Sequence, residues 1–205
     1  MKPDVPRPAK LAAREKHEFD MVSGTQEVFR LLLDAMANPG RTVDLSAHAS
    51  QFASNGMWLA LALTLLDNET GFFWDGPEEL AREIQFLSGS AQVPLESADF
   101  IFLSSLGAEQ LLSRVKAGTH RDPHESALVI VRAGGKPDQS LSIEIKGPGV
   151  PPEGRKTPLS MEEAVWIKAR DAQKYEYPRG VELVLVREDD SLLAITRKAA
   201  VTWPM

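Results

Sequence analysis

The sequence predicts an α/β fold, in which a mixed sheet is flanked by helices within a single domain. Segments with apolar residues at helical spacing alternate with short runs of β-branched and aromatic residues. This pattern gives roughly five helices and six or seven strands in mixed order. The length of 205 residues suits one domain. The 43% of hydrophobic and 25% of charged residues are usual for a chain that folds around its own core.

The first two helices are predicted between residues 23 and 66. Ser23 and Gln26 have the spacing of a capping box. Apolar residues then recur at helical spacing: Phe29, Leu32, Leu33 and Met36. The sequence Asn38-Pro39-Gly40 is expected to end this helix. Met57–Leu66 is apolar on nearly every side, which predicts a helix buried in the core.

The alternation continues through the middle of the chain. Phe72–Trp74 is typical of a short strand, and Pro77 stands where the first residue of a helix tolerates proline. The apolar stripe of that helix consists of Leu80, Ile84 and Leu87. A strand is expected near Asp99–Leu103, followed by a helix through Ala108–Lys116 that stops at Gly118.

The last third of the chain is predicted to hold two hairpins and a helix. Strands Ala127–Val131 and Leu141–Ile145 flank a Gly-Gly-Lys-Pro-Asp turn, which indicates a hairpin. Ser160 and Glu163 have the spacing of a second capping box, which opens a helix that runs to about residue 173. A second hairpin is predicted from two further strands, Val181–Val186 and Leu192–Thr196.

Two segments are expected to lie outside regular elements. Residues 1–18 are rich in proline and charge, and they are predicted to form a mobile N-terminal arm ahead of the domain at 19–205. The arm lacks the apolar region of a signal peptide. The Pro- and Gly-rich segment Lys146–Pro158 is the candidate hinge or long active loop.

Composition excludes several classes of function. The chain has no cysteine, which rules out disulfides, thiolate nucleophiles, iron–sulfur clusters and Cys-ligated zinc, and suits a reducing cytoplasm. A net charge of −6 and a pI near 5.3 argue against nucleic acid or an anionic membrane as the main partner. The longest apolar run is too short for a transmembrane helix. We therefore expect a soluble, cytoplasmic protein.

Two short motifs partly match known catalytic or phosphate-binding patterns. Gly134-Gly135-Lys136 is similar to part of a phosphate-binding loop, but Pro137 follows the lysine and strands flank both sides. A hairpin turn is favoured. Ser113 and Lys116 have the spacing of Ser-Lys acyl-enzymes, but the partner motifs S-D-N and K-T-G are absent. A solvated helix face is favoured for this pair.

The stretch GTHRDPHESA holds two of the four histidines of the chain. On a helix, His120 and His124 would lie on one face and could share a metal ion. Pro123 lies between them and keeps Asp122 out of the helical region, so no metal site is expected. Asp122 is instead predicted to cap one short turn that begins at Pro123. The histidines belong to that turn, or alternatively contact a phosphate or a partner.

Two groups of charged residues leave alternatives open. Asp67 and Glu69 could act as an acid–base pair, although neighbouring carboxylates at a helix end usually form a solvated turn. Four cations could converge on a phosphate or lie scattered on the surface: Lys174, Arg179, Arg197 and Lys198. No lysine has the setting of a Schiff base, so no cofactor is expected.

Five segments follow one another in the order seen in one protein family. They are the helix Phe29–Met36 with its break at Pro39-Gly40, then Leu63–Thr70, Gly118–Ala127, Leu141–Val150 and Tyr177–Leu185. On these segments the chain resembles the PhnH subunits of the bacterial carbon–phosphorus lyase system, which serves the use of phosphonates. The resemblance spans about Phe19–Val201.

Two positions depart from the pattern of that family. The family tends to have aspartate in the place of Glu182 and a Pro-Arg-Thr-Thr run after the last strand. Here that run reads Thr196-Arg197-Lys198-Ala199, so only the arginine remains. If the lost hydroxyl groups line a site in the family, its ligand contacts differ in this chain.

The resemblance implies a fold similar to the large domain of PLP-dependent transferases, but without PLP or its lysine. It implies a homodimer when isolated, and a core complex with the companion subunits PhnG, PhnI and PhnJ. It also implies a first reaction stage in which a phosphonate displaces adenine from ATP, giving a ribose-linked phosphonate triphosphate. A separate radical iron–sulfur subunit later cleaves the carbon–phosphorus bond, and a chain without cysteine cannot carry that cluster.

We therefore expect a required, non-catalytic subunit of the transferase complex, with no catalytic residue, metal or cofactor of its own. The candidate anion pocket consists of His120, Arg121, Arg179 and Arg197. Candidates for partner contacts or loops are Pro39, Gly40, Asp67, Thr70, Pro123, Pro178 and Gly180. Two alternatives remain, which are a stand-alone phosphate- or nucleotide-binding enzyme built on that pocket and a pure scaffold protein.

Overall fold

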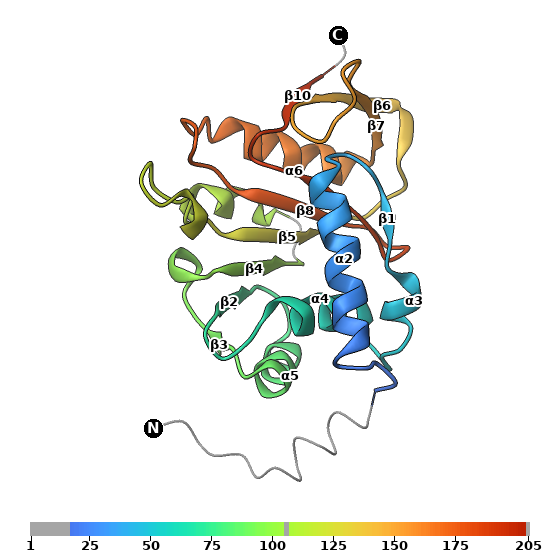
Figure 1. Ribbon diagram of the computed structural model, residues 1–205, viewed down its shortest axis with the longest axis vertical. Coiled ribbons are helices and arrows are strands. Elements are labelled where there is room, and N and C mark those ends of the chain that lie inside the picture. The colour runs from blue at the N-terminus through green and yellow to red at the C-terminus, as the bar shows by residue number, and fades with distance from the viewer. Residues whose placement is uncertain (1–16, 105–106, 204–205) are drawn as a thin grey trace.

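The chain folds around two β-sheets, which the computed structural model describes for residues 17–104 and 107–203 (Figure 1). The larger sheet has seven strands in the order β1 (Val43–Asp44), β9 (Ser191–Ile195), β8 (Glu182–Val186), β5 (Leu128–Arg132), β4 (Phe100–Leu103), β2 (Gly71–Trp74) and β3 (Ala91–Gln92). Strand β9 runs antiparallel to β1 and β8, and the remaining neighbours pair in parallel. The predicted α/β architecture, with a mixed sheet flanked by helices, is confirmed.

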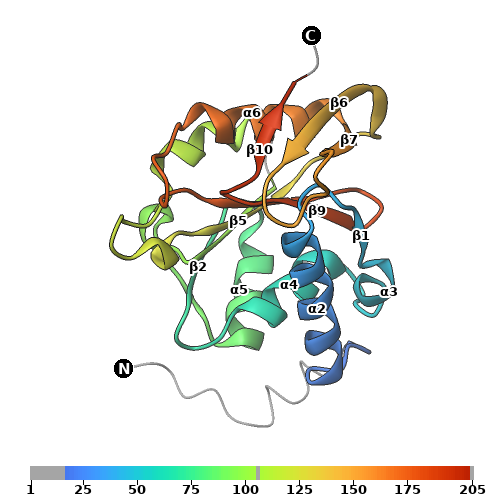
Figure 2. The same ribbon diagram turned by 45° about the horizontal axis from the view of Figure 1, so that its top comes forward.

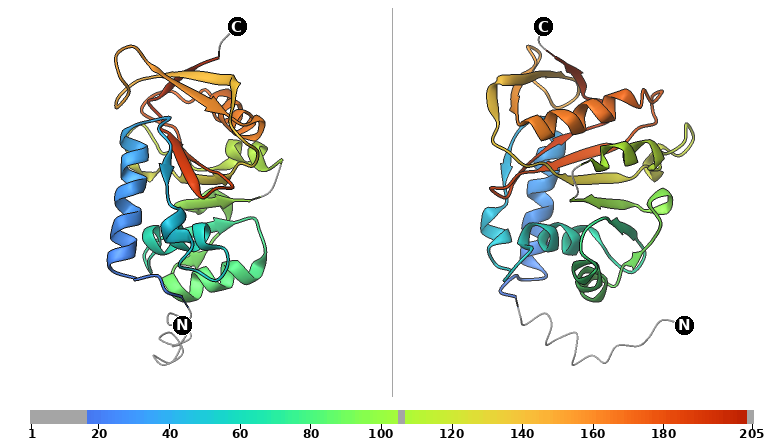
Figure 3. Two further views of the ribbon diagram at one scale, coloured as in Figure 1. Left: turned by 90° about the vertical axis from the view of Figure 1, so that its right-hand side faces the viewer. Right: turned by 180° about the vertical axis from the view of Figure 1, so that it is seen from behind.

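Helices cover the larger sheet on both faces (Figures 1 and 3). One face carries α2 (Ser23–Ala37), α3 (Ser46–Ala49), α4 (Gly56–Leu65) and α5 (Glu78–Ser88). Phe72, Phe102 and Ile130 point to this layer and form one apolar core with it. The opposite face carries α6 (Met161–Ala172), the 3₁₀ helix η2 (Ala108–Arg114) and the smaller sheet. The strand residues that point to the second layer include Ile101, Val129 and Leu183.

The smaller sheet lies beside α6 (Figure 2). Its three antiparallel strands have the order β10 (Ala200–Thr202), β6 (Asp138–Lys146) and β7 (Arg155–Leu159). The predicted hairpin between 127–131 and 141–145 is wrong, because β5 and β6 belong to different sheets. Strand β5 is paired on both sides, with β4 and β8, so it has no open edge for β6. The second predicted hairpin, β8–β9, is confirmed.

The Gly-Gly turn directs the chain from one sheet to the other. The N–H of Gly134 donates to the carboxylate of Glu162 at 2.5 Å, and Gly135 has a φ of +81°. A positive φ is readily adopted by glycine, so this pair can turn the chain out of the sheet.

Helix α2 does not begin as predicted. Ser23 is its first residue rather than its cap. The carboxylate of Asp20 instead accepts hydrogen bonds from the N–H groups of Val22 (2.7 Å) and Ser23 (2.9 Å). A carboxylate three residues earlier therefore satisfies backbone donors at the helix start.

The outward side of α2 carries apolar side chains. The residues buried against the sheet are Val28, Leu32 and Ala35. Phe29 and Leu33, which belong to the same helical spacing, instead point outward with 50% and 54% of their surface exposed. Val22, just before the helix, is 81% exposed. We call Val22, Phe29 and Leu33 the outer α2 face.

The other predicted helices agree with the structure to different degrees. Helix α4 matches the predicted core helix, and its residues 57–63 are buried. In α5 the predicted stripe is buried, although Pro77 precedes the first helical residue. The helix predicted through Ala108–Lys116 is the 3₁₀ helix η2, which ends at Arg114.

Helix α6 begins with the predicted capping box. The hydroxyl of Ser160 accepts from the N–H of Glu163 at 3.1 Å, and the Glu163 carboxylate accepts from the N–H of Ser160 at 2.6 Å. The same carboxylate pairs with Arg187 at 2.7 Å, where it is fully buried. Arg187 also donates to the Thr42 hydroxyl and the Pro158 carbonyl.

The predicted hinge Lys146–Pro158 contains the start of β7, and only its middle part is a loop. Gly149 lies in this loop with a φ of +78°, and a Cβ there would come within 1.8 Å of the Ala37 carbonyl oxygen. The loop therefore packs tightly against the end of α2.

Residues 1–16 of the predicted N-terminal arm lie outside the described residues. His17 and Glu18 contact the folded body. His17 Nε2 lies 3.3 Å from Glu83, and the Glu18 N–H donates to the Gln51 carbonyl at 3.0 Å. Across 17–104 and 107–203, no helix has both the length and the apolar character needed to cross a membrane.

Candidate functional site

Two cavities open where the amino ends of the parallel strands β4, β5 and β8 meet. The larger has a volume of about 850 Å³ and the smaller about 170 Å³. Tyr175 and Arg179, which lie between α6 and β8, line both. The polar lining of the larger cavity includes Asp99, Lys116, Thr119, His124 and Glu125. This edge of the sheet is therefore the candidate site.

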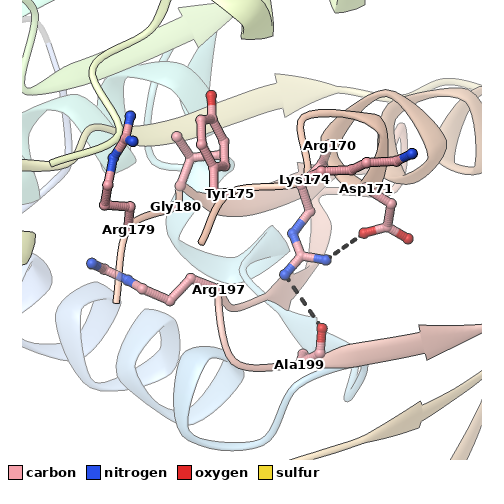
Figure 4. A pocket seen from close by; sticks show the side chains of 9 residues that line it. Arg170, Asp171, Lys174, Tyr175, Arg179, Gly180, Arg197 and Ala199 are labelled. Atoms are coloured by element: carbon pink, nitrogen blue, oxygen red, sulfur yellow. Dashed lines mark hydrogen bonds and ion pairs between the residues drawn. The ribbon is translucent and has the colours of Figure 1, made fainter. Parts of the chain in front are cut away.

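The smaller cavity is strongly cationic (Figure 4). Four of its nine lining residues are Arg170, Lys174, Arg179 and Arg197. Asp171 is the one carboxylate among the nine, and it pairs with Arg170 at 2.6 Å. Burial raises the pKa of Asp171, and the charge of Arg170 acts in the opposite direction. The positive charge thus outweighs the negative charge around this cavity.

Arg197 is held by internal partners. Its Nε donates to the Glu182 carboxylate at 2.7 Å, and its backbone N–H donates to the same carboxylate at 2.8 Å. Its Nη1 donates to the carbonyls of Pro123 (2.6 Å) and Pro178 (3.4 Å). Glu182, which replaces the aspartate of the family pattern, therefore contacts Arg197, the residue of the family run that remains in this chain. The arginine ties two loops to the sheet.

Arg179 lies beside Arg197 but its side chain makes fewer hydrogen bonds within the chain. Its Nε donates to the Gly118 carbonyl at 3.3 Å. The next residue, Gly180, donates its N–H to the Ala117 carbonyl at 2.9 Å. The structure thus brings Arg179, Arg197 and the stretch 118–126 together, as an anion pocket would require.

His120 and Arg121 line neither of these two cavities. Both are exposed, and His120 Nε2 lies 3.7 Å from Glu176. His124 lines the larger cavity. Within the described residues, no group of three or more histidines and carboxylates is placed to hold a metal ion.

The short turn that begins at Pro123 is confirmed, but it contains His124 and not His120, and its predicted cap is wrong. Pro123–Glu125 forms one 3₁₀ turn with proline at its start. The Asp122 carboxylate makes no capping bond there. The Thr119 hydroxyl accepts from the Asp122 N–H at 2.8 Å instead. A neighbouring hydroxyl therefore fixes the turn.

Asp99 and Lys116 form an ion pair at the larger cavity. Asp99 also accepts from the N–H of Gly71 at 2.8 Å. Burial acts to raise the pKa of Asp99, but the bonds from Lys116 and Gly71 outweigh it and lower the pKa below its ordinary value. Ser113 donates to the Gln110 carbonyl at 3.0 Å, so the Ser113–Lys116 spacing forms no catalytic pair here.

Tyr175 connects the two cavities. Its hydroxyl donates to the Leu112 carbonyl at 3.3 Å. Burial raises the pKa of this phenol, and the charge of Arg179 acts in the opposite direction. Figure 4 shows Tyr175 and Arg179 extending upward in the view, whereas Lys174 extends to the right, on the side of Asp171. Tyr175 was not predicted, because an isolated tyrosine after a helix has no distinctive sequence pattern.

The candidates for partner contacts have varied surroundings. Pro39 and Gly40 are buried, and Gly40 donates its N–H to the Ala194 carbonyl at 2.9 Å. Asp67 accepts from the N–H groups of Glu69 and Thr70, which makes a local turn and lowers its pKa. The others lie around Arg197 and Arg179: Pro123, Pro178 and Gly180. Their partner contacts stay a prediction.

Comparison with known proteins connects this geometry with a family. A family model described as bacterial phosphonate metabolism protein (PhnH) matches residues 17–202. A relative from Rhizobium meliloti (strain 1021), the alpha-D-ribose 1-methylphosphonate 5-triphosphate synthase subunit PhnH, is 28% identical over 180 residues. The match covers 83% of this chain and 86% of the relative. The chain belongs to the PhnH family of bacterial phosphonate metabolism proteins.

Proposed function

We propose that this chain is a required, non-catalytic subunit of an alpha-D-ribose 1-methylphosphonate 5-triphosphate synthase. The relative bears that name, and its match over most of both chains carries the proposal. In the proposed reaction the phosphonate displaces adenine from ATP, and the ribose triphosphate moiety is transferred. The companion subunits PhnG, PhnI and PhnJ would supply the catalytic groups.

The outer α2 face supports the role of a subunit. Phe29 and Leu33 lie one helical turn apart and expose about half of their surface each. The helix already buries a separate apolar side on the sheet, so these side chains are not needed to attach it. Exposed apolar groups that adjoin on one face are typical of protein contacts. We assign this face to a companion subunit.

The hydrogen bonds that the site arginines make within the chain support a non-catalytic role. Arg197 and Arg170 donate to backbone carbonyls and to one carboxylate each, and both hold loops in place. Such groups define the shape of an edge rather than act on a reacting atom. The edge would then complete a surface whose chemistry is supplied by other chains.

Three finer features belong to the same proposal. The larger sheet would correspond to the large domain of PLP-dependent transferases, which is supported by its seven strands with β9 opposed to its neighbours. Residues 1–18 would form a mobile arm before a single domain. The isolated chain would be a cytoplasmic homodimer.

The test combines co-purification with turnover. We expect the chain to co-purify with PhnG, PhnI and PhnJ, and the complex to release adenine from ATP and methylphosphonate. Omitting this chain should abolish release, and the isolated chain should release none. Turnover by the isolated chain would contradict the non-catalytic role, and full turnover without the chain would contradict a required subunit.

A matched pair of double substitutions tests the docking face. Phe29→Ser with Leu33→Ser should reduce co-purification by at least about tenfold, since two partly exposed apolar anchors are lost. Met161→Ser with Val165→Ser is the comparison, because these α6 residues are also an exposed apolar pair four residues apart and so test whether the effect is specific to α2. Equal effects of the two pairs would remove the assignment to α2.

A further inference from the structure

The arginines around the smaller cavity differ in how many of their donors are used. A guanidinium offers five N–H donors. Arg197 donates to Glu182 and two carbonyls, and Arg170 donates to Asp171 and two carbonyls. Arg179 donates only from Nε, to the Gly118 carbonyl. Among the described residues, its two terminal amino groups have no partner.

The position of Arg179 is fixed by its surroundings. Its backbone N–H donates to the Glu176 carbonyl at 3.0 Å, and Gly180 is bonded to Ala117 on the other side. Gly180 has a φ of +143°, and a Cβ there would come within 3.2 Å of the Arg197 side chain. The Gly118 carbonyl holds the guanidinium itself. The backbone and Nε of Arg179 are therefore already held, which reduces the conformational entropy lost when a ligand binds.

The surroundings favour an anion at this arginine. Arg179 lies on the wall shared by the two cavities, and three further cations line the smaller one. At the larger cavity Lys116 compensates the negative charge of Asp99, and Glu125 is the other carboxylate in the lining. A planar guanidinium with two unpaired amino groups suits the paired oxygens of a phosphate or phosphonate. A volume of about 850 Å³ can hold the rest of a small organic ligand.

We infer that Arg179 anchors an oxyanion site between the two cavities, which takes the phosphonate or phosphate group of a small ligand while Tyr175 lines its side. The ligand class rests on the proposed function, whereas the oxyanion site rests on the cavity alone. The chain would thus hold substrate or product beside the companion subunits that act on it. The chemistry shared by these ligands is a tetrahedral phosphorus oxyanion.

The test is titration calorimetry on the isolated full chain at low ionic strength. The probes are methylphosphonate, inorganic phosphate and ATP, each up to about 10 mM. We expect saturable binding of at least one probe, and Arg179→Gln should weaken it by about tenfold to a hundredfold. Tighter binding of methylphosphonate identifies a phosphonate site, and tighter binding of ATP identifies a nucleotide site.

Arg82→Gln is the matched control, because Arg82 is an exposed arginine on α5, on the other face of the sheet, and lines neither cavity. It should change the affinity by less than about twofold, since screening weakens distant exposed charges. If Arg179→Gln fails to fold, Arg179→Lys is used instead. It keeps the charge but loses the two amino groups of the guanidinium, so it should also weaken binding. Equal affinity of the wild type and the Arg179 variant would overturn the site, as would no saturable binding of any probe. Neither result would affect the proposed role as a subunit, which depends on co-purification and turnover.

Discussion

Glu163 and Arg187 form a buried ion pair that connects distant parts of the chain. Glu163 accepts from Ser160 at the start of α6 and pairs with Arg187 just after β8. Arg187 also reaches Thr42, before β1, and Pro158 in β7. Two charges taken out of water are tolerated only when each keeps its partner. The pair therefore fixes how the two sheets meet at this point.

Replacing Glu163 by glutamine should leave the Arg187 charge buried without a counter-ion. We expect a loss of about 3–5 kcal/mol in the free energy of unfolding. Urea denaturation at neutral pH measures it. Glu78→Gln is the control, since Glu78 pairs with Arg82 on the exposed side of α5, and its loss should stay within about 0.5 kcal/mol. Similar losses in both variants would contradict the importance of burial.

At the scale of elements, Asp99 ties together the starts of two strands and the segment before a third. It stands before β4 and accepts from the N–H of Gly71 at the start of β2. It also pairs with Lys116, whose carbonyl accepts from Ala127 just before β5. One carboxylate thus holds the sheet edge on which the larger cavity opens.

This arrangement predicts an acid-sensitive edge. The folded protein lowers the pKa of Asp99, so the carboxylate stabilises the fold above its ordinary pKa, and that stability is lost as the pH falls through the folded value. Asp99→Asn should therefore be clearly less stable than wild type at neutral pH, and the difference should shrink below about pH 4. Urea unfolding midpoints from neutral pH to about pH 3 measure this. A constant difference would contradict the prediction.

Local patterns allowed several elements to be predicted. The capping box at Ser160 and Glu163 and the stripe of α5 depend on residues three or four apart, so the sequence displays them. The short strands β1, β3 and β10 have two or three residues each, too few for a period to appear. The pairing of β6 depends on which strands already occupy the edges of β5. The outward direction of Phe29 depends on which side of α2 packs against the sheet. In both cases the neighbours are remote in sequence.

The candidate site was predicted only in part, for a similar reason. Arg179 and Arg197 were expected to share a pocket with the stretch 118–126, and they do lie together. The sequence could not show that Glu182 and two carbonyls already hold Arg197. It also could not show that His120 faces Glu176 instead of the cavities. Side-chain partners of this kind are set by tertiary contacts.

At the scale of the whole molecule, two apolar layers share the strands of one sheet. Each central strand sends alternate side chains into opposite layers, as Ile130 and Val129 do. Unfolding either layer would expose one side of those same strands. We therefore expect the layers to unfold together, as in a single domain.

Tryptophan fluorescence can separate the two layers. Trp58 and Trp74 belong to the layer of α2 to α5, whereas Trp166 and the partly buried Trp203 belong to the other. Each pair is replaced by phenylalanine in turn, so the fluorescence of each variant reports one layer. In urea, the fluorescence midpoint of each variant should coincide with its own circular-dichroism midpoint. Separate midpoints would show that the layers unfold independently.

The exposed apolar side chains of α2 affect how much of this chain a cell can keep folded. Copies made in excess of the other components would keep Phe29 and Leu33 facing water. Such copies tend to aggregate or to be captured by chaperones and proteases. We therefore expect the steady-state abundance of this chain to follow the scarcest of its companions rather than its own rate of synthesis.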